Sequence, residues 1–276
     1  MSRPVVAQAD TEETFDRLVD EGTQRLGRSW TGLTATALLG GIDVGAGVLG
    51  LLLVEHQTGS VVLGGLVFSI GFIALTLARS ELFTEDFLVP VTAVVARKAN
   101  ALALLRLWSV TIVGNLVGGW AITGITMAAL PDLRPLAVES GTYYIGLGFG
   151  GRAFALAVLG GFVITLMTHM QHSTESDGVR LVPAVVMGFL LGAGKLNHAI
   201  VASLLTFSAL HAGAPFGYAD WLQLFAFSAL GNIVGGLGLV TLLRLLQVPH
   251  KVKAERAQNA PPATIPGVVG NQPGRN

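Results

Sequence analysis

Four charged side chains interrupt one long apolar stretch of this chain. Arg79, Glu81, Glu85 and Asp86 lie within the run 61–96, which carries no other charged residue. A charged side chain at membrane depth is costly unless it faces protein or water. A broken helix whose irregular backbone lines a cavity meets this requirement, as in many transporters. We therefore predict a broken membrane helix here; the alternative is an ordinary loop outside the membrane that joins two short helices.

The chain also contains an internal repeat. Gly114 and Asn115 begin the block GNLVGG, and Gly231 and Asn232 begin the block GNIVGG, so the offset is 231 − 114 = 117. Small residues let membrane helices pack closely, and we assign these four residues to packing. Each repeat holds three helices, an odd number, so the second copy must be inverted in the membrane. In such an arrangement the two breaks meet at a site near the midplane.

The register of the repeat predicts a second break. Adding 117 to residue 81 gives residue 198, and Lys195, Asn197 and His198 form a polar run inside the apolar segment 180–211. An unperturbed histidine exchanges protons near neutral pH, so we predict a functional role for His198. For Glu81 we favour a structural role, in which its carboxylate accepts backbone N–H groups freed by the broken helix. Direct contact between Glu81 and substrate is the alternative.

The composition is typical of an integral membrane protein. Hydrophobic residues make up 51% of the chain, charged residues 12%, and the mean hydropathy is +0.64, whereas soluble domains carry about 25% charged residues. The formal net charge is zero, which argues against a nucleic-acid partner. The absence of cysteine excludes disulfides, thiolate catalysis and cysteine metal sites. We expect no enzymatic activity, cofactor or metal, because the closely spaced His169 and His172 have no third ligand in register.

Six apolar segments reach the roughly 20 residues that a helix needs to cross a bilayer. They lie at 30–54, 61–97, 104–129, 152–170, 180–211 and 221–247. The second and the fifth are too long for one straight helix, which agrees with a break in each.

These segments divide the chain into three parts. We predict an N-terminal segment, 1–28, with an amphipathic helix at 11–28 that lies on the membrane surface or in solvent. A six-helix channel domain, 29–247, and a disordered tail, 248–276, follow. Lys and Arg concentrate near both ends and in the connection 97–106, so the positive-inside rule places both termini in the cytoplasm. We expect a multi-pass protein of a bacterial-type plasma (inner) membrane.

The residues described so far resemble the formate/nitrite transporter family. The resemblance rests on the sequence ELFT at 81–84, the Gly-Asn pair at 114–115 and the histidine at 198, and it spans about residues 30–247. It implies an all-α integral membrane fold of aquaporin-like form, with six transmembrane helices in two inverted three-helix repeats whose second and fifth helices are broken. It also implies a homopentamer in which each protomer has its own pore. The ELFT form and the residues around the histidine are more similar to the YfdC-like branch of the family.

The resemblance also implies roles within the pore. Leu82 and Phe83 would contribute to one apolar constriction, Phe68 would form a second, and Thr84 would face the central His198. The implied function is a channel for small monovalent weak-acid anions, such as formate or nitrite, that cross with a proton. Its partners would be the small-molecule or ion substrate and membrane lipid.

Two acidic residues depart from the family pattern. Glu85 and Asp86 follow ELFT where the family has small or neutral residues, and they are candidates for selectivity. Ala202 stands where the family carries asparagine, and the vestibule lysine of anion-conducting members has no clear counterpart. An acidic mouth would concentrate a cation, so a channel for a weak base or a small neutral solute, such as ammonia or methylamine, is the alternative.

Overall fold

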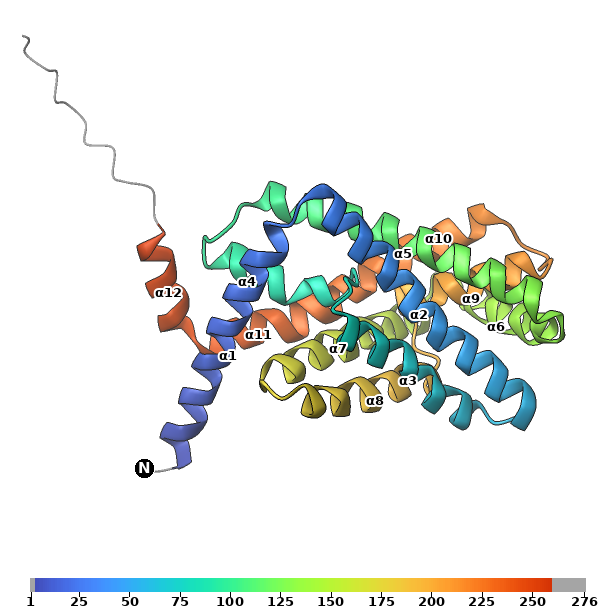
Figure 1. Cartoon of the computed structure of the whole chain (residues 1–276), viewed down its shortest axis with the longest axis horizontal. Coiled ribbons are helices and arrows are strands. Elements are labelled where there is room, and N and C mark those ends of the chain that lie inside the picture. Colours follow the sequence, from blue (N-terminus) through green and yellow to red (C-terminus); the bar gives the residue numbers. More distant parts are fainter. Residues whose placement is uncertain (1–2, 260–276) are drawn as a thin grey trace, which may run out of the picture.

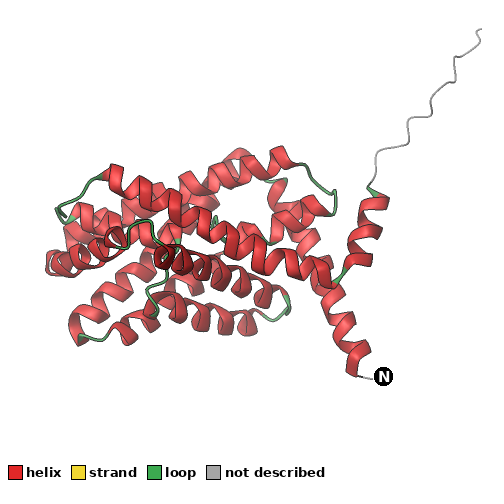
Figure 2. Ribbon diagram, turned by 180° about the vertical axis from the view of Figure 1, so that it is seen from behind, coloured by secondary structure: helices red, strands yellow, loops and turns green. Residues whose placement is uncertain are grey.

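The fold is a bundle of helices. The computed structural model describes residues 3–259, and every regular element within that range is a helix (Figure 1, Figure 2). The helices are α1 (Arg3–Leu26), α2 (Trp30–Thr58), α3 (Val61–Ala78), α4 (Val89–Val95), α5 (Ala101–Ala129), α6 (Arg134–Gly146), α7 (Gly151–His172), α8 (Asp177–Ala193), α9 (Ala199–His211), α10 (Tyr218–Ile233), α11 (Leu242–Gln247) and α12 (Pro249–Gln258). Three short segments join them: the 3₁₀ turns η1 (Glu85–Phe87) and η2 (Pro131–Leu133), and the π-helical η3 (Val234–Thr241).

Within residues 3–259, five continuous helical stretches are long and apolar enough to cross a membrane. They are α2, α3, α5, α7 and the run from α10 through η3 to α11. The fifth predicted segment, 180–211, corresponds to α8 and α9, which are 17 and 13 residues long because a break separates them. Four of the six predicted segments therefore coincide with one continuous helical stretch each. The second and the fifth each coincide with two helices separated by a break.

Both predicted breaks are present. α3 ends at Ala78, where Arg79 adopts a left-handed backbone with φ of 53°, and α8 ends at Ala193, followed closely by Lys195 with φ of 46°. A left-handed residue ends a helix, and it is uncommon for residues other than glycine. Both polar runs are thus turned out of the helical path.

The N-terminal helix packs against the bundle. Phe15, Leu18 and Val19 of α1 are buried, and they pack against Leu88, at the start of α4, and Val248, between α11 and α12. The helix expected at 11–28 therefore starts earlier, within the described range at residue 3. Its apolar face covers protein, which corrects the expected position on the membrane surface or in solvent. Figure 1 shows α1 and α12 together at one end of the bundle.

The C-terminal stretch that follows the last membrane segment is also helical. Disorder was expected from residue 248 onward, but residues 249–258 form α12. An ion pair holds α12 to α1, in which Lys251 Nζ lies 2.7 Å from Asp16 Oδ2. The expectation of disorder is therefore wrong for α12, and the rest of the expected tail, 260–276, lies outside the described residues.

Helix α6 was not expected from the sequence. It lies between the third and fourth membrane segments and packs against α9. The approach is close: a Cβ added at Gly141 of α6 would lie 2.4 Å from the Cβ of Ala209. α9 is buried along nearly its whole length, and α6 forms part of its cover.

Close helix packing recurs in the two halves of the chain. A Cβ added at Gly118 of α5 would lie 2.2 Å from the carbonyl oxygen of Leu38 in α2. A Cβ at Gly235 of η3 would lie 2.0 Å from the carbonyl oxygen of Val158 in α7. Backbone contact of this kind leaves no room for any side chain.

We therefore expect Gly235→Ala to lower stability while Gly238→Ala does not. Both residues lie in η3, but a Cβ at Gly238 meets no atom within 4 Å. Overpacking of this kind costs about 1–3 kcal/mol. Chemical unfolding in detergent micelles should show a loss of that size for Gly235→Ala and a change within about 0.5 kcal/mol for Gly238→Ala. Equal stability of the two variants would contradict the packing described.

Candidate functional site

An asparagine holds the backbone of the first break. Asn115 of α5 accepts a hydrogen bond from the Phe83 N–H through Oδ1 (3.0 Å) and donates through Nδ2 to the carbonyl oxygens of Glu81 and Ala37 (2.8 Å each). The side chain is fully buried. Because a broken helix leaves backbone groups without partners, Asn115 supplies the partners that the interrupted helix cannot.

The second break is held in the same way. Asn232 of α10 accepts from the Ala199 N–H (2.8 Å) and donates to the carbonyl oxygens of Asn197 (3.0 Å) and Ala157 (2.7 Å). The glycine and asparagine residues assigned to packing therefore have different roles. Gly114 and Gly231 bring helices together, with an added Cβ 2.5 Å and 2.4 Å from an alanine Cβ, whereas the asparagines bind the breaks.

The equivalent contacts correct the register of the breaks by one residue. Glu81 and Asn197 both give a carbonyl oxygen to the asparagine, and Arg79 and Lys195 both adopt the left-handed backbone. These pairs are offset by 197 − 81 = 116 and 195 − 79 = 116. The offset of 117 therefore fails inside the breaks. Glu81 is equivalent to Asn197, and not to His198 as predicted.

The two breaks meet at a buried hydrogen bond. Thr84 Oγ1 and His198 Nε2 lie 2.6 Å apart, and both side chains are fully buried. His198 Nδ1 accepts from the Val201 N–H (3.2 Å), so the proton of the neutral imidazole is on Nε2, which donates to Thr84. An additional proton on Nδ1 would oppose the Val201 N–H, so this geometry stabilises the neutral ring.

The first break also carries buried apolar side chains. Leu82 and Phe83, from the first break, are buried, and Phe68 of α3 belongs to the same core cluster. The Phe83 ring packs edge-on against Phe87 and Trp108, with centroids 5.0 and 6.1 Å apart. Water is excluded from such a core, so a group that crosses it must give up most of its hydration.

The Glu81 carboxylate has a different role from the one predicted. It binds the guanidinium groups of Arg25 (3.2 Å) and Arg28, both from the N-terminal helix and its end, rather than freed backbone N–H groups. Asp86 Oδ1 lies 3.6 Å from the same Arg25 nitrogen. α1 thus supplies the countercharge for the carboxyl groups of the break, because buried carboxylates require charge partners.

Outside the membrane segments, neighbouring charges shift the pKa values of Glu21 and Arg25 in opposite directions, and both shifts favour the charged form. Burial alone would raise the pKa of Glu21, but Arg25 and His172 lower it, and the net shift is downward. Burial alone would lower the pKa of Arg25, but Glu81, Glu21 and Asp86 raise it further above its ordinary value. Glu21 and Arg25 therefore both remain charged.

A cavity of about 370 Å³ lies beside α1 and opens toward the first break. Arginine side chains are prominent in its lining, and Glu85 is one of its acidic members. Its charged lining residues are Arg17, Asp20, Glu21, Arg25, Arg28, Arg79, Glu85, Glu175 and Arg180, with His172 beside them.

Two residues of the second break lie apart from this cavity. Lys195 lies over the Tyr143 ring, with Nζ 5.4 Å from the centroid, and with Glu55 lines a separate small cavity. Asn197 is fully buried and accepts a hydrogen bond from Ser228 Oγ (2.7 Å). Lys195 and the arginines are therefore distributed over two different cavities.

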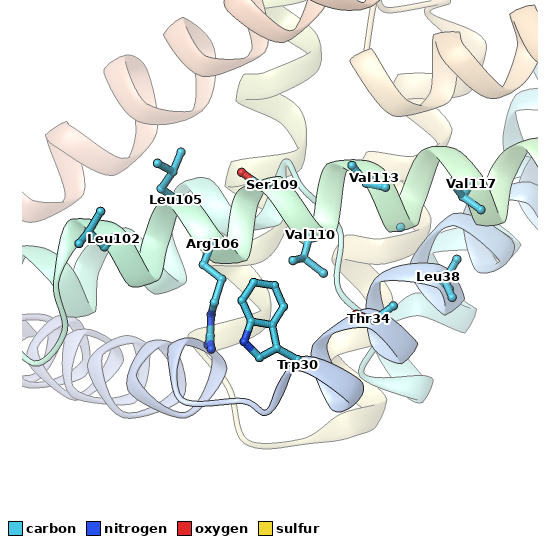
Figure 3. A pocket seen from close by; sticks show the side chains of 11 residues that line it. Trp30, Thr34, Leu38, Leu102, Leu105, Arg106, Ser109, Val110, Val113 and Val117 are labelled. Carbon is cyan, nitrogen blue, oxygen red and sulfur yellow. The ribbon is translucent and has the colours of Figure 1, made fainter.

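A larger groove, of about 800 Å³, lies on the outer face between α2 and α5 and is nearly all apolar. Figure 3 shows Arg106 of α5 beside Trp30 of α2 at one end of this groove, with the guanidinium 5.5 Å from the ring centroid. Arg106 also donates to the carbonyl oxygens of Leu26 (2.7 Å) and Arg28 (3.1 Å). It therefore fixes the turn that aims Arg28 at Glu81.

Several residues of the site were missed from the sequence. Arg25 and Arg28 belong to a helix expected at the surface, and Trp108 of α5 donates to the Asp86 carbonyl oxygen (3.2 Å). The only signal in the sequence was the excess of acidic over basic residues in the first break. Buried acidic residues require cations, but the sequence does not identify which residues supply them. Packing of α1 decides which arginines these are.

Comparison with known proteins gives consistent matches. A family model described as formate/nitrite transporter matches residues 12–246. Inner membrane protein YfdC of Escherichia coli (strain K12) is 28% identical over 267 residues, which cover 88% of this chain and 84% of that protein. Formate channel BtFdhC of Bacillus thuringiensis is 24% identical over 247 residues, which cover 83% and 92%. A solved structure described as a pentameric formate channel with formate bound has a TM-score of 0.65 at 22% identity and covers 78% of this chain and 96% of its own.

The backbone contacts of Asn115 make a direct prediction. Asn115→Leu should lower the free energy of unfolding by about 2–4 kcal/mol, because it leaves the buried Phe83 N–H and Glu81 carbonyl without partners. Chemical unfolding in detergent micelles measures this change. The exposed Gln223→Leu is the control and should change stability by less than about 0.5 kcal/mol. An Asn115→Leu variant as stable as the control would show that the break does not depend on this side chain.

Proposed function

Because the chain belongs to the formate/nitrite transporter family, we propose that it conducts small monovalent weak-acid anions, such as formate or nitrite, across a membrane together with a proton. It is a transport protein and not an enzyme. Formate is the substrate named for BtFdhC, and it is the molecule bound in the pentameric channel of similar fold.

The observation that carries this proposal is the buried hydrogen bond between Thr84 and His198. It lies in apolar surroundings to which Leu82, Phe83 and Phe68 contribute, and these side chains would form the two constrictions. An anion cannot shed its hydration there without a large cost, whereas the neutral acid can. The Nε2–H of His198, which donates to Thr84 in the structure, would donate its hydrogen bond to the passing molecule instead.

The cavity beside α1 favours an anion over a weak base. Five arginines and four carboxyl groups line it. The acidic entrance expected from the sequence is therefore not found at this cavity, where basic side chains outnumber acidic ones. The alternative, a channel for ammonia, methylamine or a small neutral solute, keeps one observation in its favour. Glu85 lines the same cavity, and Asp86 is buried next to it.

The orientation and assembly belong to the same proposal. Basic residues at both ends support cytoplasmic termini in a bacterial-type inner membrane, with α1 and its cavity on the cytoplasmic side. Residues 29–247 would be the channel domain, between an N-terminal segment and a cytoplasmic tail. The apolar groove between α2 and α5 would be covered by a neighbouring subunit or lipid in a homopentamer, each protomer with its own pore.

We expect formate or nitrite to acidify the interior of proteoliposomes that contain the protein and a trapped pH dye. His198→Phe should lower the initial rate by about tenfold or more, because loss of a buried hydrogen-bond donor costs about 1–3 kcal/mol. His211→Phe is the matched control, since His211 bonds the Trp120 carbonyl oxygen and not Thr84. Alkalinisation by methylammonium with no response to the anions would contradict the proposal and support the weak-base channel.

A further inference from the structure

The carboxyl groups around the first break outnumber the cations that reach them. Glu81, Glu85 and Asp86 are at most 4% exposed, and Glu21 of α1 joins the same cluster. Among the described residues, the guanidinium groups of Arg25 and Arg28 contact three of these four carboxyl groups, and Glu85 has no ion pair. An uncompensated buried carboxylate costs several kcal/mol, so the cluster must gain positive charge or protons.

A histidine can supply part of this charge. His172 Nε2 of α7 lies 2.9 Å from Glu21 Oε2, so a protonated His172 would pair with Glu21. Three cations would then face four carboxyl groups. On the α5 side, Trp108 presents an indole N–H to the Asp86 backbone and adds no charge. Arg17, Arg79 and Arg180 line the cavity beside α1 but form no ion pair with these four groups, so at least one carboxyl group of the break has no cation in contact within the described range.

The geometry of Asp86 identifies where a proton would reside. Asp86 Oδ1 and Glu81 Oε2 lie 3.6 Å and 3.2 Å from the same nitrogen of Arg25, so the two carboxyl groups are close neighbours. Neither Asp86 oxygen accepts a hydrogen bond from any donor in the described part of the chain. Two neighbouring buried carboxylates repel each other, and a shared proton removes this repulsion.

Glu85 places a third carboxyl group of the first break at the cavity beside α1. It follows Thr84 directly and lines the cavity beside α1, and its Oε1 likewise has no hydrogen-bond donor among the described residues. The central histidine is a poor store for the same proton, because His198 Nδ1 already accepts from the Val201 N–H.

A metal ion fits this position less well than a proton. The Arg25 guanidinium lies 3.2 Å from Glu81 and 3.6 Å from Asp86, so a cation between them would be repelled. No group of three or more His, Cys, Asp or Glu residues arranged to hold a metal occurs within residues 3–259.

We propose that Glu81 and Asp86 bind one shared proton and exchange it, through Glu85, with water in the cavity beside α1. When an anion enters from that cavity, the O–H bond of the carboxyl group breaks and the proton passes to an oxygen of the anion, directly or through water. The carboxylate left behind is stabilised by Arg25, and it is reprotonated from the cavity. The use of this proton in transport rests on the proposed passage of a weak acid; the proton site itself does not.

Infrared difference spectroscopy of the full chain in lipid tests the site. We expect the carbonyl band of a protonated carboxylic acid at neutral pH, shifted in deuterium oxide, lost in Asp86→Asn and retained in Asp86→Glu. Glu81→Gln should also remove the band. The same loss in two independent variants means that misfolding of one of them does not explain the result. The exposed Glu139→Gln is the control and should leave the band unchanged. A missing band in the wild type, or one that survives in Asp86→Asn, would overturn the proposal.

Two further comparisons separate the outcomes. Replacing choline by sodium at equal concentration should leave the band unchanged, and its removal by sodium would show a metal-ion site and overturn a proton site. Formate-driven proton flux, measured on the same preparations, should fall several-fold in Asp86→Asn and not in Glu139→Gln. A band without formate flux in the wild type would uphold the proton site and reject the proposed function. Formate flux without a band would uphold the proposed function and reject the proton site.

Discussion

The buried carboxyl groups of the first break dictate much of the surrounding structure. Glu81 and Asp86 are fully buried, and removing one partner of a buried ion pair costs about 3–5 kcal/mol. Their countercharges come from Arg25 and Arg28, so α1 has to pack against α4. Arg106 then fixes the end of α1 through two carbonyl oxygens. A segment outside the membrane core is in this way part of the site.

The two halves of the chain share a scaffold and differ in chemistry. Asn115 and Asn232 each bind two equivalent backbone groups of their break, one N–H and one carbonyl oxygen, which fixes where each break lies. The residue presented at the equivalent position is a charged Glu81 in one half and a neutral Asn197 in the other. The first break therefore carries carboxyl groups with arginine countercharges, while the second brings His198 to Thr84.

Much of this arrangement could be predicted from the sequence, because membrane burial restricts what apolar and charged residues can do. The six segments, both breaks and the meeting of Thr84 with His198 follow from hydropathy, a repeat and a family resemblance. The register within the breaks did not follow, since it shifts by one residue where the backbone leaves the helix. The packing of α1, α6 and α12 did not follow either. Their short or mixed patterns fit a solvated helix as well as a buried one, and only tertiary contacts decide between them.

The coupling between Arg25 and Glu81 tests the central claim most directly. Free energies of unfolding would be measured in micelles for Arg25→Gln, Glu81→Gln and the double variant. If α1 neutralises the break, the double variant is more stable than the sum of the single losses by about 1–3 kcal/mol. The pair of Arg180 and Asp177, 3.5 Å apart, whose carboxylate is exposed, is the control and should couple by less than about 0.5 kcal/mol. Additive losses for Arg25 and Glu81 would contradict the account.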